Sequence, residues 1–302
     1  MLREGELARR VEAARERLRA CELCPRRCGI DRLAGQVGYC RAAGDTIDVA
    51  SHNIHVWEEP PLSGSRGSGT IFFSHCTARC LFCQNYPISQ LGVGRPEDAS
   101  GLAKRMLYLQ RRGCHNINLV TPTHYVPQIL AAIEIAAQKG LRLPLVYNSS
   151  GYETVETLCL LEGVIDIYLP DSKYADDAVA AELSGYRDYI AHNRAALIEM
   201  RRQVGEELIL DEQGIAHRGM IVRHLVLPAG LSQTPQVLRW LARELSPRIH
   251  VSLMAQYFPA HRAVGHPMLG RRLSDEEYEA ALEAFDRAGL ERGWRQEMDP
   301  LY

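Results

Sequence analysis

The sequence has no apolar run long enough to cross a membrane. Its longest apolar runs, such as HLVLPAG and RLPLVY, fall well short of the ~18 to 20 residues that a membrane-spanning helix needs. The N-terminal stretch MLREGELARRVEAARERLRA is charged throughout, which is not typical of a secretory signal peptide. These two absences predict a cytoplasmic protein without a membrane partner.

The sequence also has little net charge. Its formal net charge is -2, with 24% charged and 46% apolar residues in a chain of 302. Because there is no basic excess, nothing in the composition indicates a nucleic-acid partner. A chain of this length can bury a large core, and we expect one sizeable α/β domain with a small appendage.

Strand-like runs alternate with helical patterns along most of the chain. The runs are nearly continuous Val, Ile and Leu, as expected for parallel strands that are covered on both faces. This alternation predicts a parallel sheet with right-handed crossovers, which periodicity alone leaves free to close partly into a barrel or to lie open. The six runs are 69–73, 116–121, 143–148, 164–171, 220–228 and 250–257.

Several connecting elements have clear sequence signals. An amphipathic pattern over 5–20 predicts an N-terminal helix, and a single apolar stripe over 126–140 predicts a crossover helix. The turn residues at 211–214 predict a small hairpin before the fifth strand. Ser274 with Glu277 predicts a capping box at the start of the last helix.

Seven of the nine cysteines lie in two tight clusters in the first third of the chain. An odd count in such clusters favours metal thiolates over a disulfide network. The other two, Cys114 and Cys159, lie in apolar helical surroundings and are interpreted as structural thiols.

Cys76, Cys80 and Cys83 follow the first strand at a CxxxCxxC spacing. Three thiolates on one short loop can ligate three irons of a cuboidal iron–sulfur cluster and leave the fourth iron open. A structural zinc site normally needs four protein ligands. The spacing therefore predicts a [4Fe-4S] cluster with one open iron; a pure electron-transfer cluster, or a zinc site that borrows a ligand, is the alternative.

This loop resembles the cluster loop of the radical S-adenosylmethionine superfamily. Most of 20–270 is similar to an uncharacterised branch of that superfamily related to the pyruvate formate-lyase activating enzyme. The resemblance implies a partial (β/α)6 barrel, and an open iron chelated by S-adenosylmethionine that is split by one electron from a donor such as flavodoxin or ferredoxin. It is carried by GSGTIFFSHCTARCLFCQNYPISQ, GCHNINLVTPTHYVPQI, LPLVYNSSGYE, DIYLPDSKY, VRHLVLPAG and MAQYFPAH.

The resemblance also implies which side chains contact the cofactor. Phe82 stands where the family has an aromatic residue beside the adenine, and Asp171 with Lys173 resembles an Asp-x-Lys element that holds the cofactor carboxylate. A surface salt bridge is the alternative for that pair, and a lumen ion pair is the alternative for Arg223. Apart from the resemblance, polar side chains at strand ends or within the fifth strand are further candidates, with a plain Ser- and Gly-rich turn as the alternative at 148–150; these are Thr121, Asn148, Ser149 and Arg223.

A second set of thiols precedes the main domain. Four thiolates in a Gly-rich loop can hold zinc, iron or a second cluster, and the sequence slightly favours a closed zinc or rubredoxin-like site. We therefore expect two parts, a metal module over 1–48 and the radical enzyme domain over 49–302. The four residues are Cys21, Cys24, Cys28 and Cys40.

From these features we expect an oxidoreductase-type radical enzyme that abstracts hydrogen from a substrate. Kinship suggests that the substrate is a glycine of a partner protein. Radical modification of a small molecule or of another macromolecule is a second hypothesis. A non-catalytic iron–sulfur redox or interaction protein is a third.

Overall fold

The chain folds around one mixed β-sheet, which the computed structural model describes for residues 5–298. Its strands follow the order β10-β9-β8-β6-β5-β4-β2-β1-β3, with β7 paired to β8 off this path. The strands are β1 (Ile47–His55), β2 (Ser68–Phe73), β3 (Arg95–Glu97), β4 (Ile117–Val120), β5 (Leu145–Ser149), β6 (Ile167–Pro170), β7 (Ile209–Leu210), β8 (Ala216–Leu225), β9 (His250–Met254) and β10 (Arg292–Arg295).

The six predicted strands form the parallel centre of this sheet. They correspond to β2, β4, β5, β6, β8 and β9, and each is a parallel neighbour of the next. The structure adds β10 in parallel at one edge, and β1 and β3 in antiparallel pairing at the other. A mixed α/β fold with a mainly parallel sheet is therefore confirmed, with the two edges unanticipated.

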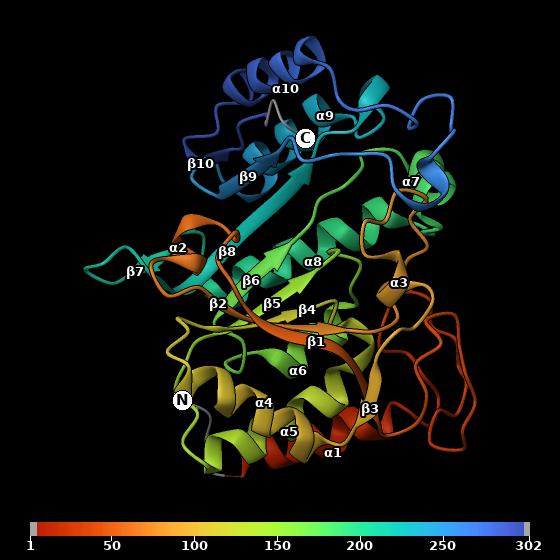
Figure 1. Cartoon of the computed structure of the whole chain (residues 1–302), viewed down its shortest axis with the longest axis vertical. Helices are drawn as coiled ribbons and strands as arrows, with labels where there is room; N and C mark the ends of the chain where they lie inside the picture. Colours follow the sequence, from red (N-terminus) through yellow and green to blue (C-terminus); the bar gives the residue numbers. More distant parts are fainter. Residues whose placement is uncertain (1–4, 299–302) are drawn as a thin grey trace.

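Helices cover the sheet, and Figure 1 shows α1, α4 and α5 together at one end of the molecule and α9 and α10 at the other. The predicted crossover helix is confirmed as α5. The helices are α1 (Glu6–Glu16), α2 (Pro60–Ser63), α3 (Tyr86–Ser89), α4 (Ala99–Arg111), α5 (Val126–Gln138), α6 (Val155–Leu161), α7 (Asp177–Ser184), α8 (Tyr189–Val204), α9 (Thr234–Trp240) and α10 (Asp275–Ala288).

Two local predictions are confirmed by hydrogen bonds. The hairpin joins β7 and β8 in antiparallel pairing through the turn at 211–214. At the start of α10 the Ser274 hydroxyl accepts from the amide of Glu277, whose carboxylate accepts from the amide of Ser274. These signals are readable because each depends on residues close together in the chain.

The cysteine-rich N-terminal segment packs directly against the main domain. Helix α1 lies against α5, and Ala14, Cys40 and Ala42 belong to the same buried cluster as the sheet. The predicted boundary between 48 and 49 falls inside β1. In the part of the chain that the structure describes, no helix is both long and apolar enough to span a bilayer.

A second buried cluster lies beneath the three-cysteine loop. It is rich in tyrosine: Tyr152 is tilted against Tyr186 at 4.7 Å between ring centroids, and Tyr186 against Tyr189 at 4.8 Å. Ring pairs in such offset or edge-on arrangements are favourable beyond the area they bury. Cys76 and Cys80 pack against this cluster, so buried aromatic side chains support the loop from below.

Candidate functional site

The three predicted cluster cysteines lie on one loop at the carboxyl end of β2. Two backbone bonds fasten this loop to the end of α7: the amide of Arg79 donates to the carbonyl of Ser184 at 2.9 Å, and that of Leu81 to Leu183 at 2.8 Å. The Gln90 side-chain amide donates to the Cys80 carbonyl at 2.9 Å. The loop is therefore held in place by the protein's own hydrogen bonds.

Burial affects the ionisation of two thiols of this loop. Burial raises the pKa of the Cys76 thiol to about 12 and also raises that of Cys80. A thiol with such a pKa stays protonated at neutral pH until a metal displaces its proton. The Cys83 thiol and the Ser89 hydroxyl are hydrogen-bonded at 3.1 Å, which orients the third ligand.

Lys173 and Asp171 lie beside the loop, at the carboxyl end of β6. The ammonium is 2.6 Å from the carboxylate, and both side chains are less than one-fifth exposed. Burial lowers the pKa of Lys173, but Asp171 and Cys80 outweigh it and raise that pKa overall. The structure thus places a partly buried, charged lysine near the Cys80 thiol, in an ion pair that is mostly covered by the protein.

Arg223 has its charge partners within the protein. Its Nε donates to Glu59 at 2.7 Å, and its guanidinium also contacts Glu58. Both carboxylates are 7% exposed or less at their side chains. The structure therefore holds Arg223 in an ion pair inside the protein, as one alternative from the sequence has it. His224, the next residue, hydrogen-bonds Ser172 and Thr234 on the other side of the strand.

The candidates at β4 and β5 lie at the carboxyl ends of these adjacent strands. The amide of Thr121 donates to the carbonyl of Asn148 at 2.9 Å, and Thr121 has a φ of 61°. A β-branched residue at positive φ is uncommon and strained. Ser149 is buried, and its hydroxyl accepts from the amide of Gly151 at 3.2 Å.

Glu153 is a buried acid that sequence reasoning missed. Its carboxylate accepts from the Thr123 hydroxyl at 2.7 Å and from the Tyr147 hydroxyl at 3.2 Å. Burial raises the pKa of Glu153 to about 7, against the hydrogen bonds from Thr123, Ser149 and Tyr147. The only signal in the sequence was an acidic residue just after NSSGY, which does not reveal burial.

Phe82 is 6% exposed and lies edge-on to Tyr257, with 5.9 Å between the ring centroids. An open cavity begins next to it, lined by Gln84, Tyr257, Phe258 and Met298 among others. Phe82 thus belongs to the buried aromatic cluster and packs against Tyr257, which also lines this cavity.

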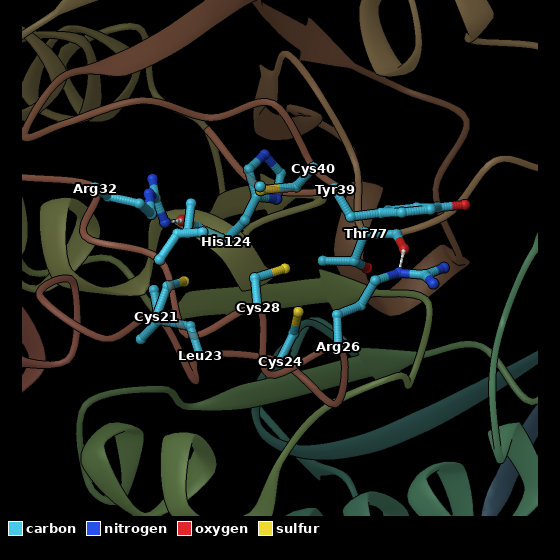
Figure 2. Close-up of a pocket in the computed structure, with 12 residues that line it drawn as sticks. Cys21, Leu23, Cys24, Arg26, Cys28, Arg32, Tyr39, Cys40, Thr77 and His124 are labelled. Atoms are coloured by element: carbon cyan, nitrogen blue, oxygen red, sulfur yellow. Dashed lines mark hydrogen bonds between the residues drawn. The ribbon is translucent and has the colours of Figure 1, made fainter. Parts of the chain in front are cut away.

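The four N-terminal cysteines are brought together by the fold. Cys21, Cys24, Cys28 and Cys40 line a single partly enclosed cavity, shown in Figure 2. The cavity lies against the three-cysteine loop, because Thr77 also lines it. The four N-terminal cysteines and the three-cysteine loop therefore approach each other at Thr77, the residue that follows Cys76.

The fold is similar to that of radical S-adenosylmethionine enzymes. The FeFe-hydrogenase maturase HydG from Carboxydothermus hydrogenoformans matches with a TM-score of 0.52 and 13% identity, over 74% of this chain and 52% of that one. Methylornithine synthase (PylB) matches at 0.48 and 13%, over 70% and 60%. The chain thus spans little more than half of these structures, and the likeness shows the fold alone.

No protein-family model matches the sequence. One curated relative does: over 292 residues the chain is 32% identical to uncharacterised protein MJ0674 of Methanocaldococcus jannaschii, which covers 93% of this chain and 79% of the relative. Identity at this level along nearly the whole chain indicates common descent and a common fold. The chain therefore belongs to the same family as that archaeal protein.

Proposed function

We propose that the protein is a radical S-adenosylmethionine enzyme of the branch related to the pyruvate formate-lyase activating enzyme, built on a partial (β/α)6 barrel. One observation carries this proposal. Cys76, Cys80 and Cys83 stand on a fastened loop at the carboxyl end of β2, where parallel α/β folds keep their chemistry. The same fold in HydG supports it.

The donor set fits a [4Fe-4S] cluster. Three thiolates of one loop supply three ligands, and soft sulfur ligands suit iron–sulfur clusters. When bound, the cluster and S-adenosylmethionine supply a one-electron cleavage that yields a carbon radical able to take a hydrogen atom from substrate. The protein's part is to position the cofactor and to exclude water.

The side chains around the loop have different roles in positioning the cofactor. Lys173 neutralises the cofactor carboxylate and is aimed by Asp171, which lies 2.6 Å from it. Phe82 packs on the adenine side. Thr121 offers its hydroxyl group to the methionine or ribose end. Buried Ser149 and Glu153 hold this strand edge in position through hydrogen bonds to Gly151 and Thr123.

The proposed partners follow from the chemistry. A one-electron donor such as flavodoxin or ferredoxin supplies the electron. The substrate is a glycyl backbone position of a partner protein, as kinship suggests; the open cavity at Gln84 and Tyr257 lies beside the loop and provides room for an extended segment. Deuterium at the partner glycine would then appear in 5'-deoxyadenosine, and its absence with every candidate partner would favour a small-molecule substrate.

Cleavage of S-adenosylmethionine tests the core of the proposal. The anaerobically reconstituted protein with dithionite should form 5'-deoxyadenosine, measured by liquid chromatography and mass spectrometry. Cys80→Ala should lose it, because one iron loses its thiolate. Cys159→Ala is the matched control, since that thiol is exposed and outside both groups of cysteines. A fully iron-loaded native protein that forms no product would refute the proposal.

A further inference from the structure

The N-terminal cysteine module surrounds one small cavity, of about 10 Å³. Its four thiols line this space together with Arg26, Arg32, Tyr39, Thr77 and His124, as Figure 2 shows. Cys21, Cys24 and Cys40 are each 8% exposed, and Cys28 is more open. All four are free thiols. The fold thus gathers four soft ligands from a 20-residue segment around one volume.

A buried cation without a carboxylate partner faces the same cavity. Arg32 is 1% exposed, and one of its nitrogens donates to the backbone carbonyl of His124 at 2.7 Å. Within residues 5–298, its Nε and its second terminal nitrogen have no hydrogen-bond partner. A buried guanidinium in this condition is costly unless an anion accompanies it. A negatively charged group inside the cavity would stabilise the buried guanidinium of Arg32. A metal centre with four thiolates carries such a negative charge.

The spacing of the thiols distinguishes between kinds of metal centre. Across residues 5–298, no three His, Cys, Asp or Glu side chains lie close enough together to hold one ion. A zinc or rubredoxin-type ion binds sulfur at about 2.3 Å and draws four thiolates into a compact tetrahedron without a void. Thiols that are too far apart for one ion instead match a larger inorganic core that puts its own atoms between them. The favoured single-ion interpretation of the sequence is thus not supported by this geometry.

We propose that Cys21, Cys24, Cys28 and Cys40 ligate a second iron–sulfur cluster, which relays electrons to the three-cysteine loop. Every iron of a cluster held by four thiolates has its protein ligand, so it has no open position for a cofactor. Its part is electron transfer. The cluster site and its iron content are independent of the proposed function, whereas the relay rests on it.

The route between the two sites is short. Thr77 lines the cavity and directly follows Cys76 in the chain. Arg26 fastens this junction: its Nε donates to the Thr77 carbonyl at 2.8 Å, and its guanidinium lies 3.4 Å from the Tyr39 ring centroid. On the other side Cys28 and Tyr39 are partly exposed, so a donor protein can approach.

The redox step balances without any bond change at this site. A reduced one-electron carrier of the flavodoxin or ferredoxin class gives up one electron and is oxidised. The N-terminal cluster accepts that electron and passes it to the cluster on the three-cysteine loop. No bond forms or breaks at the N-terminal site and no proton moves there.

Metal and sulfide analysis tests the site directly. A variant with Cys76, Cys80 and Cys83 all changed to Ala isolates it, and the anaerobically reconstituted variant should hold about four iron and four sulfide per chain, or about two of each for a smaller cluster. The native protein should exceed it by about four of each. Bound zinc, or a single iron without sulfide, would overturn the proposal.

A complementary variant tests the ligands. Cys28→Ala should lower the iron and sulfide of the native protein from about eight of each to about four of each, or from about six for the smaller cluster. Cys114→Ala is the matched control, because this buried thiol lies outside both groups and should leave the metal content unchanged. Unchanged iron and sulfide in Cys28→Ala would contradict the assignment, and the three-cysteine variant keeps the test decisive if Cys28→Ala fails to fold.

The relay is tested by comparing two reductants. The ratio of 5'-deoxyadenosine formed with reduced flavodoxin to that formed with dithionite should fall several-fold in Cys28→Ala, because a small reductant also reaches the loop cluster directly. An unchanged ratio would overturn the relay and leave the cluster assignment standing. If the native protein forms no product with either reductant, the proposed function fails, whereas the iron and sulfide content still decides the cluster.

Discussion

Lys173→Ala should weaken S-adenosylmethionine binding strongly while leaving the metal site loaded. The Lys173 side chain is 18% exposed, and its ammonium lies 2.6 Å from Asp171. The ammonium is also close enough to the Cys80 thiol to oppose the rise in the thiol's pKa that burial causes. In the proposed complex it donates to the cofactor carboxylate. Losing a hydrogen bond to a charged group costs about 1.5 to 3 kcal/mol. That corresponds to about a ten- to hundredfold increase in the dissociation constant.

The assay is isothermal titration of the anaerobic, iron-loaded protein with S-adenosylmethionine, with the iron content measured on the same sample. Lys104→Ala is a matched control, because the chain has only three lysines and Lys104 lies exposed on α4. Affinity that stays within twofold of the native value, about 0.4 kcal/mol, at equal iron content would refute the reasoning. The 2.6 Å pair of Lys173 and Asp171 would then serve the structure alone.

Two further predictions concern buried charge. Arg223→Met should lower the free energy of unfolding by about 3 to 5 kcal/mol, measured by chemical denaturation, because it leaves the Glu58 and Glu59 carboxylates buried without their cation; a change below about 1 kcal/mol would contradict the ion-pair assignment. Glu153, whose pKa burial raises from 4.5 to about 7, binds its proton longer in the folded than in the unfolded state, so its contribution to stability falls as pH rises through this window. The unfolding free energy of Glu153→Gln minus that of the native protein should therefore rise by about 3 kcal/mol between pH 4.5 and 7. A difference independent of pH would show that folding does not raise the pKa of Glu153.

The sequence was informative where a signal lies within one short segment. The central strands were readable because both of their faces are covered, which leaves long apolar runs. The edge strands could not be predicted in this way. β1 contains polar residues such as His52 and Asn53, and the exposure of β10 alternates from residue to residue, so neither has such a run.

Long-range pairing explains most of what the sequence left open at the site. Arg223 and its partner Glu59 are 164 residues apart, and only the packing of β8 over the segment before α2 brings them together. Glu153 is likewise an ordinary acid in the sequence. The fold buries it and brings Thr123, just after β4, to 2.7 Å from its carboxylate; the burial raises its pKa against that hydrogen bond.

By itself the sequence determined the alternation of strands and helices, the capping box of α10 and the spacing of both groups of cysteines. Each of these depends on neighbours along the chain, whose relative positions the backbone limits to a few arrangements. Only the tertiary structure decided that Arg223 is neutralised inside the protein and that the four N-terminal thiols enclose a cavity beside Cys76. Those relations depend on how distant segments pack, and local patterns carry no information about the distances between them.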